Sequence, residues 1–338
     1  MFFALTDDQR EFDAAVRGWL TDRFDLEAVR GVFDDPDGPG HSDTLWKAAA
    51  EQGWLAVTVP EEHDGLGLGL VEAQVISRAL GAGSAPGPWR GSVLAADAVR
   101  LAGSDEQRAA WLPRLAAGEV IGTVAFRGTA PGTLPAVEYG ALADLVVAPT
   151  EDGLTLVTDG EATPAGSFDR TTRLATVAAG AGEALPGATA EVRAELTARA
   201  TVLVAADLVG IAREAVRRTV AYDRDRQQFG VPVGSFQAIK HALADLHTAV
   251  TMAEHAVLYA AHSADTGTDD AELAVSVAKA KASDTAVEAT RAMIQYHGGI
   301  GYTWEHEAHF FYKRAKRLAG QCGTADEHRA RIAELTIG

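Results

Sequence analysis

The chain has few of the residues on which several classes of protein depend. Its 338 residues include one cysteine, Cys322, so an internal disulfide and a cysteine-built metal site are excluded, and we expect a reducing, cytoplasmic setting. Basic residues are scarce too, since 30 Lys and Arg stand against 47 Asp and Glu, a formal net charge of −17. This balance argues against a protein that binds nucleic acid or an anionic membrane, because binding to either requires a basic surface on the protein.

Long apolar runs are also missing. The run 202–211 is interrupted by Asp207 and is too short to cross a bilayer. Residues 1–5 lack the basic region and the long apolar core of a signal peptide, so we expect none. The remaining composition, 47% hydrophobic and 23% charged, is typical of a globular protein with a substantial core.

Helical and strand-like patterns alternate along the chain. Residues 6–9 have the form of a capping box, and apolar residues then recur at helical spacing up to position 20. Short β-branched runs between residues 121 and 158, bounded by Gly, Pro and Asp, predict a small sheet. The other helical patterns lie at 45–53, 71–80, 93–102, 106–117, 189–223, 236–263, 269–297, 306–319 and 325–335.

The last five of these patterns are long and joined by short connections, which predicts an antiparallel bundle. We therefore predict an α+β fold that is mostly α. Its expected domains are an N-terminal helical domain (1–119), a shortened middle β domain (120–187) and a C-terminal helical bundle (188–338).

Two stretches, 223–237 and 295–302, begin where long helical patterns end, so each can present polar side chains at the tip of a rigid element. The first offers a fixed cation, Arg226, together with amides and aromatic rings. The second offers the amide of Gln295 and a Gly298-Gly299 backbone that a ligand can approach without meeting a Cβ. These groups are suited to a large anionic cofactor.

The order and spacing of several motifs resemble the acyl-CoA dehydrogenase family, and the resemblance covers nearly the whole chain. The N-terminal part carries Gly53-Trp54, then Val59-Pro60-Glu61-Glu62 and a glycine-rich turn; the C-terminal part carries the two stretches described above. The resemblance implies a reaction in which a proton leaves Cα of an acyl-CoA and a hydride leaves Cβ for FAD.

In this family the C-terminal stretches hold the FAD of a neighbouring subunit. The resemblance therefore implies that Arg226 pairs with the pyrophosphate of FAD, an interaction that suits a guanidinium fork. The remaining residues implied to bind FAD are Gln228, Phe229, Phe236 and Gln237 on the adenosine side, and Gln295, Gly298 and Gly299 at the other end.

The chain departs from the family at the catalytic base. The position of the usual glutamate is occupied by Cys322, and an alternative base position on the first helix of the bundle is occupied by Ala200. Alanine cannot take a proton, and an ordinary cysteine is mostly protonated at neutral pH, so we assign no catalytic residue and interpret Cys322 as a packing residue. The middle segment also lacks the family's flavin-facing Thr-Glu-Pro passage and tryptophan strand.

The residues with which the family contacts the FAD of a neighbouring subunit, which we call the trans half of the cofactor site, are thus retained. The residues that hold a subunit's own FAD, the cis half, are missing. This pattern favours the accessory subunit of a heteromeric dehydrogenase, which would share FAD with a catalytic subunit that mainly holds the acyl-CoA, as in actinobacterial steroid side-chain degradation. The resemblance further implies a two-plus-two heterotetramer and electron-transfer flavoprotein as acceptor. Two alternatives stay open: a self-sufficient dehydrogenase with a displaced base, Glu195 or Cys322, and a structural paralogue that binds neither FAD nor CoA.

Three further features concern charged or metal-ligating side chains. Asp207, in an apolar helical run, is expected either to pair with an arginine or to face a partner chain. The histidines at 297, 306 and 309 lack metal-site spacing, so we predict no metal. The basic run 313–317 either steers an anionic ligand or forms a solvated or interface surface.

Overall fold

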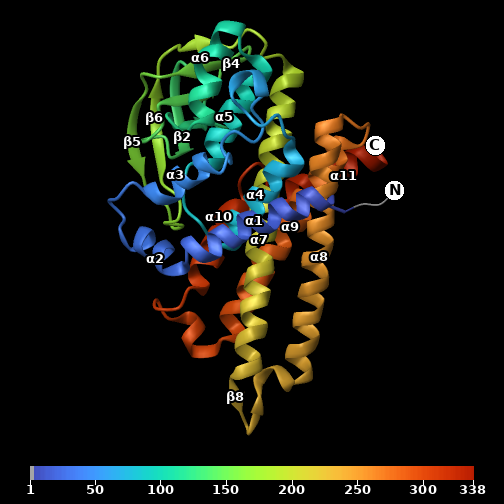
Figure 1. The fold of residues 1–338 in the computed structure, drawn as a ribbon. Coiled ribbons are helices and arrows are strands. Elements are labelled where there is room, and N and C mark those ends of the chain that lie inside the picture. The colour runs from blue at the N-terminus through green and yellow to red at the C-terminus, as the bar shows by residue number, and fades with distance from the viewer. Residues whose placement is uncertain (1–3) are drawn as a thin grey trace. The chain divides into compact units, whose positions relative to one another are not determined.

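The computed structural model describes residues 4–338, which form two compact units (Figure 1). We call Glu27–Ala73 with Pro86–Ala200 the sheet unit. The chain up to Leu26, Gln74–Ala85 and Thr201–Gly338 form what we call the bundle unit. The three domain boundaries expected from the sequence stay a prediction.

Helices of the sheet unit end where the sequence provides stop signals. Gly118 adopts φ +68°, and its N–H donates to Leu115 O while Glu119 N–H donates to Arg114 O, which closes the preceding helix as expected for a glycine C-cap. The helical elements of this region are α2 (Leu26–Asp34), α3 (Asp43–Glu51), the 3-10 turn η1 (Glu61–His63), α5 (Trp89–Ala102) and α6 (Asp105–Ala116).

Seven short strands form two sheets. The strands are β1 (Gly122–Val124), β2 (Gly132–Glu138), β3 (Leu145–Pro149), β4 (Leu154–Val157), β5 (Glu161–Ala165), β6 (Leu174–Ala179) and β7 (Glu183–Ala184). One sheet has the order β1-β3-β4-β7, with β1 parallel to β3 and the other pairs antiparallel; the other is the antiparallel sheet β2-β6-β5. The predicted strand runs are confirmed as β1, β3 and β4, whereas the other four strands had not been predicted.

The bundle unit is built from long helices. Its elements are α1 (Asp7–Arg23), most of α4 (Leu70–Ala82), α7 (Ala190–Asp225) from Thr201 onward, β8 (Gln227–Gln228), β9 (Val231–Pro232), η2 (Val233–Ser235), α8 (Gln237–Thr266), α9 (Ala271–Tyr296), η3 (Gly298–Tyr302), α10 (Ala308–Ala319) and α11 (Ala325–Ile337). Helix α8 packs on α9, which also contacts α10 and α11. Figure 1 shows α7 and α8 side by side, joined through the β8–β9 hairpin.

Helices α4 and α7 approach closely within the bundle unit because glycines face their contact. A Cβ on Gly81 would lie 2.2 Å from Asp207 O, and a Cβ on Gly210 would lie 2.0 Å from Arg78 O. Ser77 Oγ adds a hydrogen bond of 2.7 Å to Leu203 O. The two backbones therefore meet directly, and larger residues at either glycine would push them apart.

A buried ion pair joins α7 to α10. The Arg314 guanidinium donates from Nη2 to Asp207 Oδ2 at 2.6 Å and from Nε to Oδ1 at 3.0 Å, and its Nη1 donates to Ala85 O. Both side chains are buried. Of the two interpretations of Asp207, pairing with an arginine is therefore the one the structure confirms.

Candidate cofactor-binding site

The first candidate stretch forms a hairpin at the end of α7. Gln227 pairs with Pro232 and Gln228 with Val231, so Phe229 and Gly230 are the two turn residues. Both have positive φ, +55° and +79°, which defines a two-residue type I′ turn. An aromatic residue in this backbone region is strained by about 1–3 kcal/mol, and such outliers concentrate at ligand and switch sites.

The side chains of this hairpin face outward. Phe229 is 92% exposed, and its ring meets Phe236 edge-on, with 6.3 Å between ring centroids. The Arg226 guanidinium is exposed, and it has no hydrogen-bond or ion-pair partner among residues 4–338. Gln228 and Gln237 are exposed as well. The stretch thus presents a free cation, two amides and two rings to something outside the chain.

Helix α8 begins beside these groups without a side-chain cap. Its N-cap, Phe236, makes no capping hydrogen bond with its side chain, so the first N–H groups of a 30-residue helix lack a side-chain acceptor. The N-terminus of a long helix favours negative charge. Together with Arg226, this helix end fits a diphosphate.

The second stretch follows the end of α9. Gln295, Gly298 and Gly299 are exposed, and a Cβ at either glycine would meet no atom of the described residues within 4 Å. Gly298 also has φ +64°, which favours glycine there on conformational grounds alone. The surface around Gly298 and Gly299 is therefore open to a ligand or another subunit.

Stacked rings place the two stretches side by side. Tyr222, one turn before Arg226, stacks on His297 with 4.4 Å between centroids, and His297 lies 4.6 Å from the ring of His306. The Nδ1 atom of His297 is 2.7 Å from Met293 O. Burial, followed by the charges of His306 and Arg218, lowers the pKa of His297, so the ring stays neutral at neutral pH. This column of rings fixes the ends of α7 and α9 against each other.

The expected base position, Cys322, lies in a turn whose backbone carbonyls accept hydrogen bonds from a buried lysine. Cys322 is half-buried with φ +55°, and its carbonyl accepts from His328 Nε2 at 2.8 Å. Lys279 of α9 is fully buried and donates from Nζ to Gly323 O at 2.8 Å, to Ala319 O at 3.2 Å and to Ser283 Oγ at 3.0 Å. Burial lowers the pKa of Lys279 to about 8.

The other two base candidates provide no better group. Ala200 is completely buried on α7. The Glu195 carboxylate is 40% exposed and lies 4.0 Å from the Arg199 guanidinium, at the limit of an ion pair. In this part of the sheet unit, the structure therefore offers a solvated carboxylate and an inert methyl group.

Sequence reasoning missed Lys279 and a buried carboxylate, Asp223. A signal existed for both. Lys279 is spaced three and seven residues from the buried Ala282 and Ala286, and Asp223 is seven residues from the buried Val216. Each therefore lies on the buried face of its helix, where a charged side chain is costly unless it forms an ion pair or hydrogen bonds.

Among the described residues, no three His, Cys, Asp or Glu side chains are placed to share a metal ion. A bilayer-spanning helix is likewise not found within residues 4–338. Of the basic run, Arg314 is buried against Asp207, and the Lys313 ammonium lies 4.4 Å from the centre of the Trp304 ring. At least these two residues of the run are thus engaged within the unit.

Comparison with known proteins identifies the family to which the chain belongs. Profiles of the acyl-CoA dehydrogenase N-terminal and C-terminal domains match residues 6–119 and 191–336. The acyl-CoA dehydrogenase IpdE2 of Mycolicibacterium smegmatis is 36% identical over 309 residues, which cover 90% of this chain and 91% of that protein. The chain therefore belongs to the acyl-CoA dehydrogenase family, whose members use FAD.

Two solved structures share the fold. A chain of the ChsE4-ChsE5 complex from Mycobacterium tuberculosis superposes with a TM-score of 0.91 at 24% identity, covering 99% of this chain and 98% of that one. A chain of a variant of the Tcur3481-Tcur3483 steroid ACAD superposes with a TM-score of 0.86 at 26% identity, covering 98% of both chains. The predicted order of a helical part, a small β part and a helical bundle is thereby confirmed.

Proposed function

We propose that this chain is the accessory subunit of a heteromeric, FAD-dependent acyl-CoA dehydrogenase, and that it contributes the trans half of a FAD site to a catalytic subunit. The observation that carries the proposal is the outward-facing hairpin: an unpartnered Arg226 beside a strained, exposed Phe229. The Arg226 guanidinium has no partner among residues 4–338, and strain of the kind seen at Phe229 persists where function requires it.

The residues of both stretches fit the cofactor. Arg226 and the uncapped start of α8 suit its pyrophosphate, and Phe229 and Phe236 offer faces for the adenosine. Gln295 and the open backbone at Gly298 can contact the other end. When bound, FAD supplies the hydride acceptor, while these residues bind and orient it.

The absence of a base supports the accessory role. Cys322 and Ala200 offer no carboxylate, and the turn at Cys322 is held by Lys279. The abstraction of a proton from Cα therefore belongs, in this proposal, to the catalytic subunit, which also binds the acyl-CoA. Likeness to the Tcur3481-Tcur3483 steroid ACAD at 26% identity supports a steroid side-chain thioester as the substrate class.

The substitution Arg226→Ala tests the trans contribution. Co-expression with a candidate catalytic subunit of the same family should yield a yellow, active complex that transfers electrons to electron-transfer flavoprotein. In the Arg226→Ala complex we expect bound flavin to fall about tenfold or more, because a charge-assisted contact to the diphosphate is lost. Flavin absorbance per complex is the measurement, with dehydrogenase activity as a second readout.

Arg213→Ala is the matched control, since Arg213 lies on the same helix but is half-exposed and pairs with Glu254 at 2.8 Å. Its complex should retain flavin. Full flavin occupancy in Arg226→Ala, or an active yellow oligomer formed by this chain alone, would contradict the proposal.

A further inference from the structure

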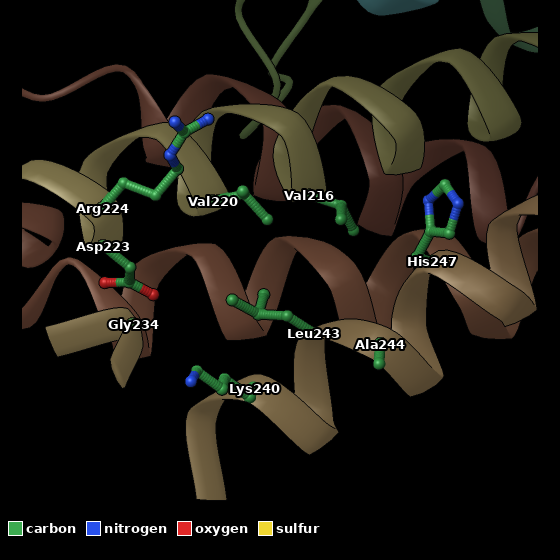
Figure 2. A pocket seen from close by; sticks show the side chains of 9 residues that line it. All are labelled: Val216, Val220, Asp223, Arg224, Gly234, Lys240, Leu243, Ala244 and His247. Carbon is green, nitrogen blue, oxygen red and sulfur yellow. The ribbon is translucent and has the colours of Figure 1, made fainter. Parts of the chain in front are cut away.

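A pocket lies between α7 and α8, next to the hairpin. Its volume is about 340 Å³, and Figure 2 shows Val216 and Val220 of α7 facing Leu243 of α8 across it. Polar residues line the same pocket: Asp223 and Arg224 near the end of α7, and Lys240 and His247 on α8. The walls are thus apolar, and a carboxylate lies at the hairpin end.

Asp223 is buried without a partner. The residue is 1% exposed, and neither carboxylate oxygen has a hydrogen-bond partner among the described residues. Burial raises the pKa of this carboxyl to about 6, so at neutral pH it is mostly a buried, unpaired anion. Such a group is costly unless a donor pairs with it.

The nearby cations of the chain do not supply that donor. Neither Arg224 nor Lys240 forms an ion pair with Asp223, and Figure 2 shows the Arg224 guanidinium pointing away from the carboxylate. Gly234, at which a Cβ would lie 3.4 Å from Asp223 Cβ, brings the η2 turn against this residue. The residue is therefore closely packed on this side, and both carboxylate oxygens, which are closed to solvent in the isolated chain, lack a donor among the described residues.

The shape and chemistry of the pocket match an arginine side chain. Its methylenes would contact Val216, Val220 and Leu243, and its planar fork can donate two parallel N–H bonds to the two free oxygens of Asp223. An ammonium would satisfy the charge but not both oxygens in this geometry.

The position of the pocket identifies where that arginine comes from. Val220, at its edge, is 37% exposed, and the nearby hairpin exposes the rings of Phe229 and Phe236. Exposed apolar side chains beside a buried unpaired charge are typical of an interface. We propose that the α7–α8 pocket receives an arginine side chain of the partner subunit, with Asp223 as its acceptor. This inference rests on the proposed function, because the hairpin beside the pocket is the surface assigned there to the partner.

The isosteric substitution Asp223→Asn tests this pairing in the complex of the full-length chains. We expect the dissociation constant of the complex to rise about 30-fold or more, since a buried charge pair is broken. Asp225→Asn is the matched control: it removes the same charge two residues away, at an exposed position, and should change the constant little. Subunit exchange or mass photometry of serial dilutions measures the constant.

Each other outcome is decisive. If Asp223→Asn and Asp225→Asn complexes dissociate alike while the wild-type complex is tight and yellow, the present inference fails and the proposed function stands. If the wild-type chain forms no complex, both fail. Two results would overturn the assignment to a partner subunit. In the first, the free chain forms a homodimer that Asp223→Asn abolishes. In the second, n-butylguanidinium stabilises the free wild-type chain but not the Asp223→Asn chain, and it leaves the affinity of the complex unchanged.

Discussion

At the scale of single residues, Asp223 is expected to destabilise the isolated chain. Its folded-state pKa of about 6 lies above the ordinary value near 4, so the folded state holds this proton more tightly than the unfolded state does. Stability therefore falls as pH rises from about 4 to about 6 and stays lower above that range.

Asp223→Asn should remove this dependence. Relative to wild type, its free energy of unfolding should gain about 2–3 kcal/mol between pH 4.5 and pH 7.5. Urea denaturation of the free chain at both pH values measures the gain. The exposed Asp225→Asn should show no comparable gain, and a parallel pH profile for Asp223→Asn and wild type would rule out a titrating carboxyl at this position.

Because of Lys279, we expect the stability of the chain to change with pH in the opposite direction at alkaline pH. Burial lowers its pKa to about 8, so between about pH 8 and its ordinary value of 10.5 the unfolded state binds the proton that the folded state has released. Stability contributed by this group therefore rises with pH across that window, by up to about 3 kcal/mol. Denaturation of wild type and Lys279→Met between pH 7.5 and 10 should show a rise that the variant lacks.

Lys281→Met, two residues away on α9 and half-exposed, provides the comparison for that experiment. It should retain the wild-type slope. If Lys279→Met retains it as well, the amine does not titrate in this range, and its hydrogen bonds to Ala319 O and Gly323 O involve a permanently charged group.

At the scale of helices, the Asp207–Arg314 pair is the contact between α7 and α10 that substitution can test most directly. Asp207→Ala should cost about 3–5 kcal/mol, because it removes the carboxylate that balances the charge of a buried guanidinium. The double variant Asp207→Ala with Arg314→Ala should cost less than the sum of the single changes Asp207→Ala and Arg314→Ala. Equilibrium unfolding of all four proteins gives the coupling energy.

The exposed Arg213–Glu254 pair, which joins α7 to α8, serves as a reference. Its removal by Glu254→Ala should change stability by no more than about 1 kcal/mol. Additive losses at Asp207 and Arg314 would show that the two side chains are stabilised independently of each other.

Helices and strands differed in how far the sequence could predict them. Long helices such as α8 and α9 repeat buried alanine and valine positions over many turns, so their periodicity was unmistakable. Strand β5 has no such repeat, since its residues are mostly exposed or half-exposed and include Pro164. The hairpin turn at Phe229 was equally hidden, because Phe-Gly lacks the Asn-Gly or Asp-Gly signature of a type I′ turn.

At the scale of the whole molecule, the sequence predicted the order of helical and β regions and the family. Among the buried charges it predicted the pairing of Asp207 but missed Asp223 and Lys279. The run 223–226 alternates Asp and Arg and therefore resembles a solvated helix end, yet only Asp223 turns inward. Which side of a helix is covered depends on tertiary packing, which periodicity alone does not supply when polar residues dominate a turn.

The unpaired carboxylate of Asp223 also bears on how long an unassembled subunit survives in a cell. If only a partner can pair this buried charge, assembly adds to the folding free energy of the chain by mass action. Subunits made in excess of the partner would then unfold more often and be degraded by proteases faster. The pocket would thus tie the abundance of this subunit to the supply of its partner, without any dedicated regulator.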